Sequence, residues 1–79
     1  MNDNPEAHMA LEKALAADAS GEVREGLKND FLVRAREVQG VINRGVPPER
    51  YQRLVMYSRA LDAAAQVVDE MWHRLRRSA

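Results

Sequence analysis

The chain has 79 residues, no cysteine, and twelve basic against twelve acidic side chains. This length accommodates a single domain over residues 1–79. The absence of cysteine excludes a disulfide framework and a thiolate metal site, and two histidines are too few to build a zinc site. A formal net charge of zero argues against a nucleic-acid clamp, which needs a concentrated basic surface. A chain this short needs very regular helix packing or a partner to stay folded.

The hydropathy pattern also argues against a membrane protein. No apolar run approaches the roughly 20 residues that a membrane-spanning helix needs. The polar start, from Met1 to Glu6, has neither the basic nor the apolar region of a signal peptide. We therefore expect a cytoplasmic protein that does not enter a membrane.

The sequence predicts an all-α fold, because threonine is absent, aromatic residues make up 5% of the chain and no stretch alternates with period two. Asn4 and Pro5 have the residue types of a helix cap and a first helical position. Ser20 is expected to cap a second helix, and Gly45 to end it. The three predicted helices cover residues about 5–17, 21–44 and 48–76.

The two long helices each carry apolar residues at spacings of three and four, so each presents an apolar face. Because only a few residues separate them, we expect these helices to be antiparallel neighbours. The expected fold is an antiparallel helical hairpin of two long helices with a short N-terminal helix. The predicted core residues are Leu27, Phe31, Val38, Ile42, Leu54, Leu61, Val68 and Leu75.

The third helix is the longer arm, so Trp72 and Leu75 extend beyond the start of the second helix. Either the first helix folds back over them or another protein covers them. The third helix also carries a second apolar stripe, roughly 90° round from the first. The first helix has little apolar content to cover this stripe, so a docking surface for another chain is favoured. The predicted partner-binding residues are Tyr57, Ala60, Ala64, Val67 and Met71, extending to Trp72.

No catalytic constellation is recognisable in the sequence. Glu70 and His73 have the spacing of a di-iron motif, but they fall on the polar side of the third helix and the motif occurs once. An enzyme resembling a helical chorismate mutase needs arginine and glutamate lining a pocket, and Arg34 is its one candidate near the core. We therefore expect no enzymatic activity, no catalytic or metal-binding residue and no cofactor.

The turn between the long helices carries the most specific motif, a Gly-x-x-Pro-Glu-x-Tyr-Gln-x-Leu run. It is formed by Gly45, Pro48, Glu49, Tyr51, Gln52 and Leu54. With the break at residues 18–21 and the stretch from Ala60 to Trp72, it resembles the YscE family of bacterial type III secretion co-chaperones for the needle subunit. The resemblance covers roughly residues 9–76.

This resemblance implies a small cytoplasmic bacterial protein that binds and stabilises a tetratricopeptide-like helical chaperone. Together the two would keep the needle subunit soluble and unpolymerised before export. The alternative is a self-associating module, in which two hairpins bury their second stripes in a homodimeric four-helix bundle. Both interpretations involve protein partners, and neither involves nucleic acid or a membrane.

Overall fold

The computed structural model describes residues 5–78 of the chain. Within this range there are three helices and no strand, so the expected all-α class is confirmed. The helices are α1 (Pro5–Ala16), α2 (Glu22–Asn43) and α3 (Pro48–Ser78). The last helix therefore runs two residues past the expected end at about residue 76. Asn4, expected to cap the first helix, lies outside the described residues.

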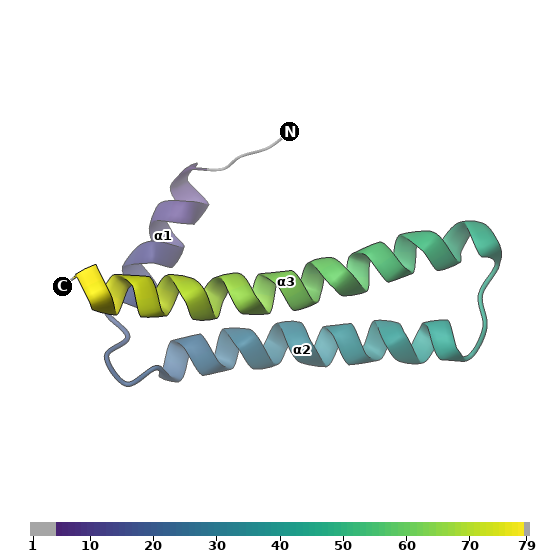
Figure 1. The fold of residues 1–79 in the computed structure, drawn as a ribbon, viewed down its shortest axis with the longest axis horizontal. Helices are drawn as coiled ribbons and strands as arrows, with labels where there is room; N and C mark the ends of the chain where they lie inside the picture. The colour runs from purple at the N-terminus through teal and green to yellow at the C-terminus, as the bar shows by residue number, and fades with distance from the viewer. Residues whose placement is uncertain (1–4, 79) are drawn as a thin grey trace.

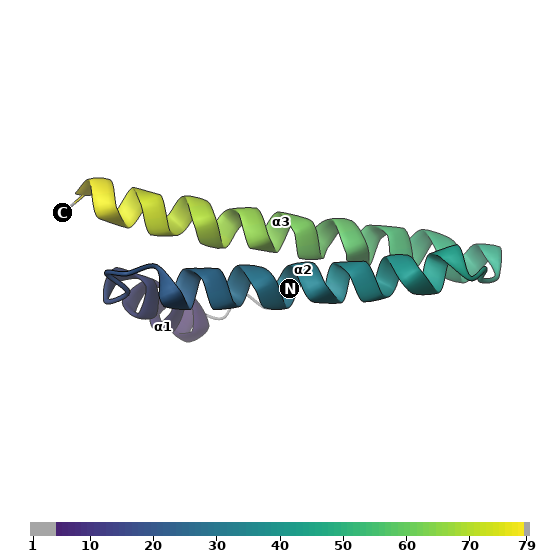
Figure 2. The same cartoon turned by 90° about the horizontal axis from the view of Figure 1, so that it is seen from below.

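The two long helices lie side by side and run in opposite directions along their length (Figures 1 and 2). Residues 44–47 connect them at one end of the molecule. At the other end, α1 lies at a steep angle to the pair and contacts both α3 and α2. Because α3 is longer than α2, its carboxyl end extends past the start of α2 to the level of α1.

Gly45 ends α2 and allows the chain to reverse. Its φ of 95° is in the left-handed region, which glycine adopts at no steric cost. Its N–H donates to the carbonyl oxygen of Ile42 at 3.0 Å, which satisfies one of the last carbonyls of the helix. Pro48 then begins α3, where a missing N–H costs nothing. The carbonyl oxygen of Pro47 accepts the N–H of Tyr51 at 2.9 Å.

The core is thin, as expected for two paired helices crossed by a short third one. Its buried apolar residues are Leu15, Ala35, Leu61, Ala65 and Val68. Leu61 and Val68 are thus the buried members of the predicted core set. The half-buried members are Leu27, Phe31, Val38, Ile42, Leu54 and Leu75. Leu15 of α1, which the predicted set did not include, is 0% exposed.

Candidate interaction surface

One face of α3 carries apolar side chains that α1 and α2 leave open. This face is the second stripe, which consists of Tyr57, Ala60, Ala64, Val67 and Met71. Tyr57 is 47% exposed, Val67 is 51% exposed, and Ala60 between them is also exposed. The other two members are half-buried. The stripe therefore presents unburied apolar area at a helical spacing.

An apolar notch of about 240 Å³ lies where the three helices meet. All of its lining residues are apolar, and they are Leu11, Leu27, Phe31, Ala64, Val67 and Val68. Ala64 and Val67 belong to the second stripe, and Leu11 comes from α1. The first helix therefore borders the stripe at this point, whereas Tyr57 and Ala60 remain exposed nearer the turn.

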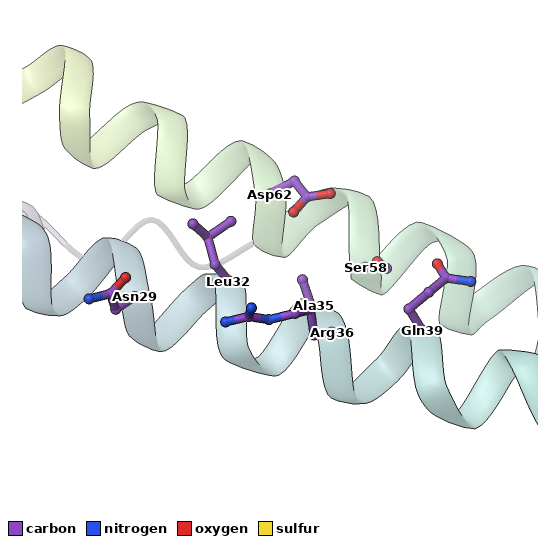
Figure 3. Close-up of a pocket in the computed structure, with 7 residues that line it drawn as sticks. All are labelled: Asn29, Leu32, Ala35, Arg36, Gln39, Ser58 and Asp62. Carbon is purple, nitrogen blue, oxygen red and sulfur yellow. The ribbon is translucent and has the colours of Figure 1, made fainter.

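A second groove between α2 and α3, of about 530 Å³, is lined mainly by residues with polar or charged end groups, together with two apolar ones (Figure 3). The lining residues are Asn29, Leu32, Ala35, Arg36, Gln39, Ser58 and Asp62. Asp62 and Ala64 are two positions apart, so they point roughly 160° apart around α3. This groove therefore lies on the opposite side of the helix pair from the notch. Arg34, the candidate in the enzyme alternative, is exposed and does not line it.

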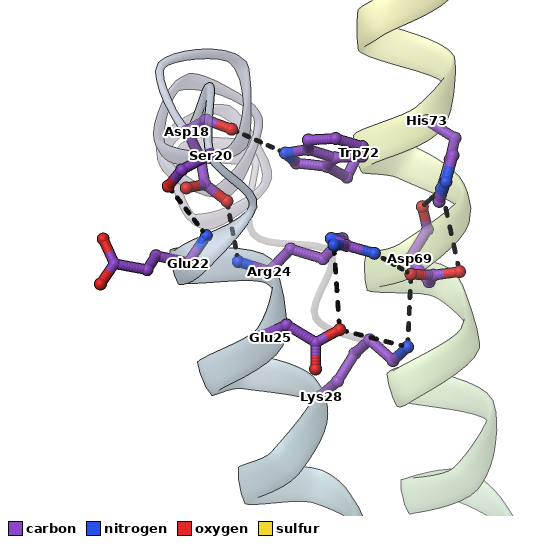
Figure 4. Close-up of polar contacts among 9 residues, drawn as sticks. All are labelled: Asp18, Ser20, Glu22, Arg24, Glu25, Lys28, Asp69, Trp72 and His73. Carbon is purple, nitrogen blue, oxygen red and sulfur yellow. Dashed lines mark hydrogen bonds and ion pairs between the residues drawn. The ribbon is translucent and has the colours of Figure 1, made fainter.

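Trp72, the last of the predicted partner-binding residues, is half-buried and makes its polar contact within the chain (Figure 4). Its Nε1–H donates to the carbonyl oxygen of Asp18 at 2.8 Å. The guanidinium groups of Arg24 and Arg76 lie 4.5 and 4.9 Å from the ring centroid, a distance at which cations are attracted to the aromatic face. The connection between α1 and α2 therefore covers the overhanging Trp72.

Arg76 caps the carboxyl end of α1. Its Nη2 donates to the carbonyl oxygens of Leu15 and Ala16 at 2.6 and 2.7 Å, and its Nη1 donates to that of Asp18 at 3.1 Å. The last carbonyls of a helix lack partners within the helix, and they attract positive charge. A side chain of α3 thus supplies the cap that α1 does not contain.

Asp18 performs the corresponding role at the start of α2. It is 6% exposed, and its Oδ2 accepts the backbone N–H of Arg24 at 2.9 Å. The prediction of Ser20 as the cap is wrong, because Gly21 occupies the capping position; the hydroxyl of Ser20 accepts the N–H of Glu22 at 3.3 Å, which is the longer of the two bonds. Gly21 precedes the helix with a φ of 82°, so the chain turns sharply enough to bring Asp18 over the helix end.

The charge on Asp18 is favoured by this position. Burial, the largest single effect, raises the pKa of its carboxyl group, and the backbone N–H groups at the start of α2 lower it. The positive charge of Arg76 lowers the pKa further. The net pKa of Asp18 lies below its ordinary value of 3.8.

Asp69 of α3 forms a second charged contact with α2, below Trp72 in Figure 4. Its Oδ1 accepts hydrogen bonds from Arg24 Nη1 at 3.0 Å and Lys28 Nζ at 3.4 Å. The bond from Arg24 lowers the pKa of Asp69 most, burial opposes it, and Lys28 and His73 lower it further, so the net shift is downward. Partly exposed ion pairs add little to stability, but these favour the register in which Arg24 faces Asp69.

Two other kinds of site can be assessed over residues 5–78. In this range no three His, Cys, Asp or Glu side chains group as ligands for a metal ion. The same range contains no helix with the length and apolar character needed to cross a membrane. His73, one half of the di-iron spacing considered from the sequence, places its Nδ1 2.8 Å from the carbonyl oxygen of Asp69.

The contacts around Asp18 and Arg76 are the part of the site that the sequence pattern did not reveal. In the sequence, Asp18 belongs to the break at residues 18–21. Arg76 is one of two arginines in the last turn of α3, where the helix dipole alone favours a positive charge. The available signal was Trp72, which extends past the second helix and so needs a partner for its indole N–H.

Residues 9–75 match the family model described as "Type III secretion system, cytoplasmic E component of needle". No curated protein and no solved structure matches the chain. The matched range spans all of α2, the turn, the second stripe and Trp72. The chain therefore belongs to the YscE family, the cytoplasmic E components of the type III secretion needle.

Proposed function

We propose that this protein is a cytoplasmic co-chaperone that binds and stabilises a tetratricopeptide-like helical chaperone. Together the two keep the needle subunit soluble and unpolymerised before export. Membership of a needle-component family supports a role in type III secretion. Within the chain, the observation that carries the proposal is the exposed second stripe of α3.

The second stripe has the chemistry of a helix-docking surface. Tyr57 and Val67 supply large apolar side chains that are about half exposed, and Ala60 between them is small enough to admit a close approach. Fully burying an exposed apolar side chain of this size contributes about 1.5–3 kcal/mol, so burying the exposed half of Val67 contributes about half of that. Contiguous exposed apolar residues at helical spacing are typical of surfaces that receive another helix.

In this proposal the chain works as one domain, in which the hairpin of α2 and α3 presents the stripe and α1 borders its end. The contact residues proposed are Tyr57, Ala60, Ala64, Val67 and Met71. Trp72 contributes indirectly, because its indole holds the connection between α1 and α2. The polar groove on the opposite side has mixed charge, with Arg36 and Asp62 both lining it, and plays no part in the docking.

The test is the mass of the protein, measured by size-exclusion chromatography with light scattering, alone and mixed with a tetratricopeptide-like chaperone of the same secretion system. We expect a complex with one copy of each chain in the mixture. Adding the needle subunit to this complex should give a larger soluble species and no filaments. A homodimer of this chain that persists in the mixture would contradict the proposal and favour the self-associating module.

A further inference from the structure

The first helix makes its apolar contacts with the rest of the molecule near one end. Residues 6–10, its amino-terminal half, are all exposed. Leu11 is half-buried in the apolar notch, and Leu15 is fully buried. The apolar contact of α1 therefore depends on two leucines one helical turn apart, both in its carboxyl half.

At the same end, side chains of α3 also make polar contacts with α1 and with the connection that follows it. Two side chains of α3, Trp72 and Arg76, donate four hydrogen bonds to carbonyl oxygens of residues 15, 16 and 18. Of these two side chains, Arg76 is the one that reaches the carbonyls of α1 itself, those of Leu15 and Ala16. The bond from Trp72 ends on Asp18, which is held separately by its own contact with the start of α2.

These contacts suggest that α1 can detach while Asp18 and the two long helices stay in place. Asp18 stays in place as long as it caps α2, so a break in the contacts of Arg76 frees the chain only up to about residue 17. A helix of 12 residues is only marginally stable in water by itself. Once α1 leaves the surface it will therefore lose its helical hydrogen bonds, and its amide protons will exchange with solvent.

We propose that α1 is a flap, held closed by Arg76, that opens without unfolding the pair of α2 and α3. Opening removes Leu11 from the notch and uncovers the surface beneath Leu15. The exposed apolar area of the protein is therefore larger when the flap is open than when it is closed. This device follows from the contacts of Arg76 and does not rest on the proposed co-chaperone function.

Arg76→Gln tests the flap, and Arg77→Gln is its matched control. Both substitutions remove one positive charge from the last turn of α3, but only Arg76 has hydrogen bonds to α1. In Arg76→Gln we expect amide exchange over residues 6–17 to accelerate roughly tenfold or more, with little change over α2 and residues 48–70. An apolar dye such as anilinonaphthalene sulfonate should fluoresce more with Arg76→Gln than with Arg77→Gln.

A second variant, Trp72→Phe, removes the bond to Asp18 and keeps an aromatic ring between the helices. It should accelerate exchange over residues 6–17 less than Arg76→Gln does. Three outcomes overturn the proposal: unchanged exchange of α1 in Arg76→Gln, equal acceleration in all three helices, or an effect of Arg77→Gln or Trp72→Phe as large as that of Arg76→Gln.

Discussion

The indole of Trp72 donates its hydrogen bond to the carbonyl oxygen of Asp18, 54 positions earlier in the chain. The carboxylate of the same aspartate accepts the N–H of Arg24 at the start of α2. One residue of the connection thus contacts α3 through its backbone and α2 through its side chain. Because α1 ends two residues before Asp18, this double contact determines where α1 leaves the helix pair.

The first prediction concerns Asp18 and pH. Its folded pKa lies below the ordinary value of 3.8, so its charge contributes stability at neutral pH that is lost as the pH falls through the folded pKa. Asp18→Asn lacks this charge at every pH. The variant should therefore melt several degrees below the parent near pH 7. The difference in melting temperature between the two proteins should become smaller below about pH 4.

Thermal melts followed by circular dichroism between pH 7 and pH 2.5 measure this difference. Asp62→Asn is the control, because Asp62 is an exposed aspartate that does not cap a helix. If the difference in melting temperature between Asp18→Asn and the parent stays constant down to the lowest pH, the lost charge is not its cause. The replacement of a carboxylate oxygen by an amide group would then be responsible.

The second prediction locates the docking face. Val67→Glu places a charge on the second stripe, at a valine that is 51% exposed at the edge of the apolar notch, so the carboxylate can stay in water when the protein is free. Far-UV circular dichroism should stay close to that of the parent, and binding to the tetratricopeptide-like chaperone should fall at least about a hundredfold, since a charge would be desolvated in an apolar contact. Isothermal titration calorimetry measures the affinity.

Gln66→Glu is the matched control, since it adds the same charge at the neighbouring, exposed position outside the stripe. It should bind as the parent does. Normal binding by Val67→Glu would mean that the partner uses another face of the molecule.

The third prediction concerns the core. Leu61 is 6% exposed between the long helices. A glutamate there would have to bury its charge at a cost of several kcal/mol, which is comparable to the whole stability of a domain of this size. Leu61→Glu should therefore lose most of its helical circular dichroism at room temperature. Leu61→Met, which keeps the volume, should fold and lose less than about 1.5 kcal/mol. A folded Leu61→Glu would show that the two helices do not depend on this contact.

The all-α class and the family could be predicted from the sequence because their signals are local. Pro48 and Gly45 act within one helical turn, and the spacing of apolar residues predicts the second stripe whatever the tertiary arrangement. The residue that caps α2 cannot be identified from its immediate neighbours in the sequence alone. Ser20 and Asp18 both carry oxygen acceptors close to the helix start, and the path of the connection decides which makes the shorter bond.

The contacts of Arg76 could not be predicted from local signals at all. A basic residue in the last turn of a helix is sufficiently explained by its own helix dipole. Its actual partners, the carbonyl oxygens of Leu15 and Ala16, lie about sixty positions away and become accessible only because α3 extends past α2. Length differences between paired helices thus indicate where such long-range caps form, without indicating which side chain provides them.

The last prediction concerns two glycines with opposite roles. A Cβ added to Gly26, in the middle of α2, meets no atom within 4 Å, so nothing in the fold requires glycine there. Gly26→Ala should raise the stability by about 0.5–1 kcal/mol, because alanine loses less backbone entropy in a helix. Gly21 has a φ of 82°, and a Cβ there would lie 2.8 Å from Nη2 of Arg24. Gly21→Ala should lower the stability by about 1–2 kcal/mol, because a left-handed conformation strains any residue with a Cβ.

Melting temperatures separate these two effects, since about 1 kcal/mol shifts the midpoint of so small a domain by roughly 4–8 °C. The two variants should therefore move in opposite directions from the parent. Gly21→Ala should also weaken the hydrogen bond between the Asp18 carboxylate and the N–H of Arg24. The substitution displaces the turn that places Asp18 over the start of α2. Indole fluorescence of Trp72, the chain's one tryptophan, should then shift to longer wavelength in Gly21→Ala and not in Gly26→Ala. An unshifted spectrum in both variants would mean that Asp18 and Trp72 stay paired even when the turn is strained.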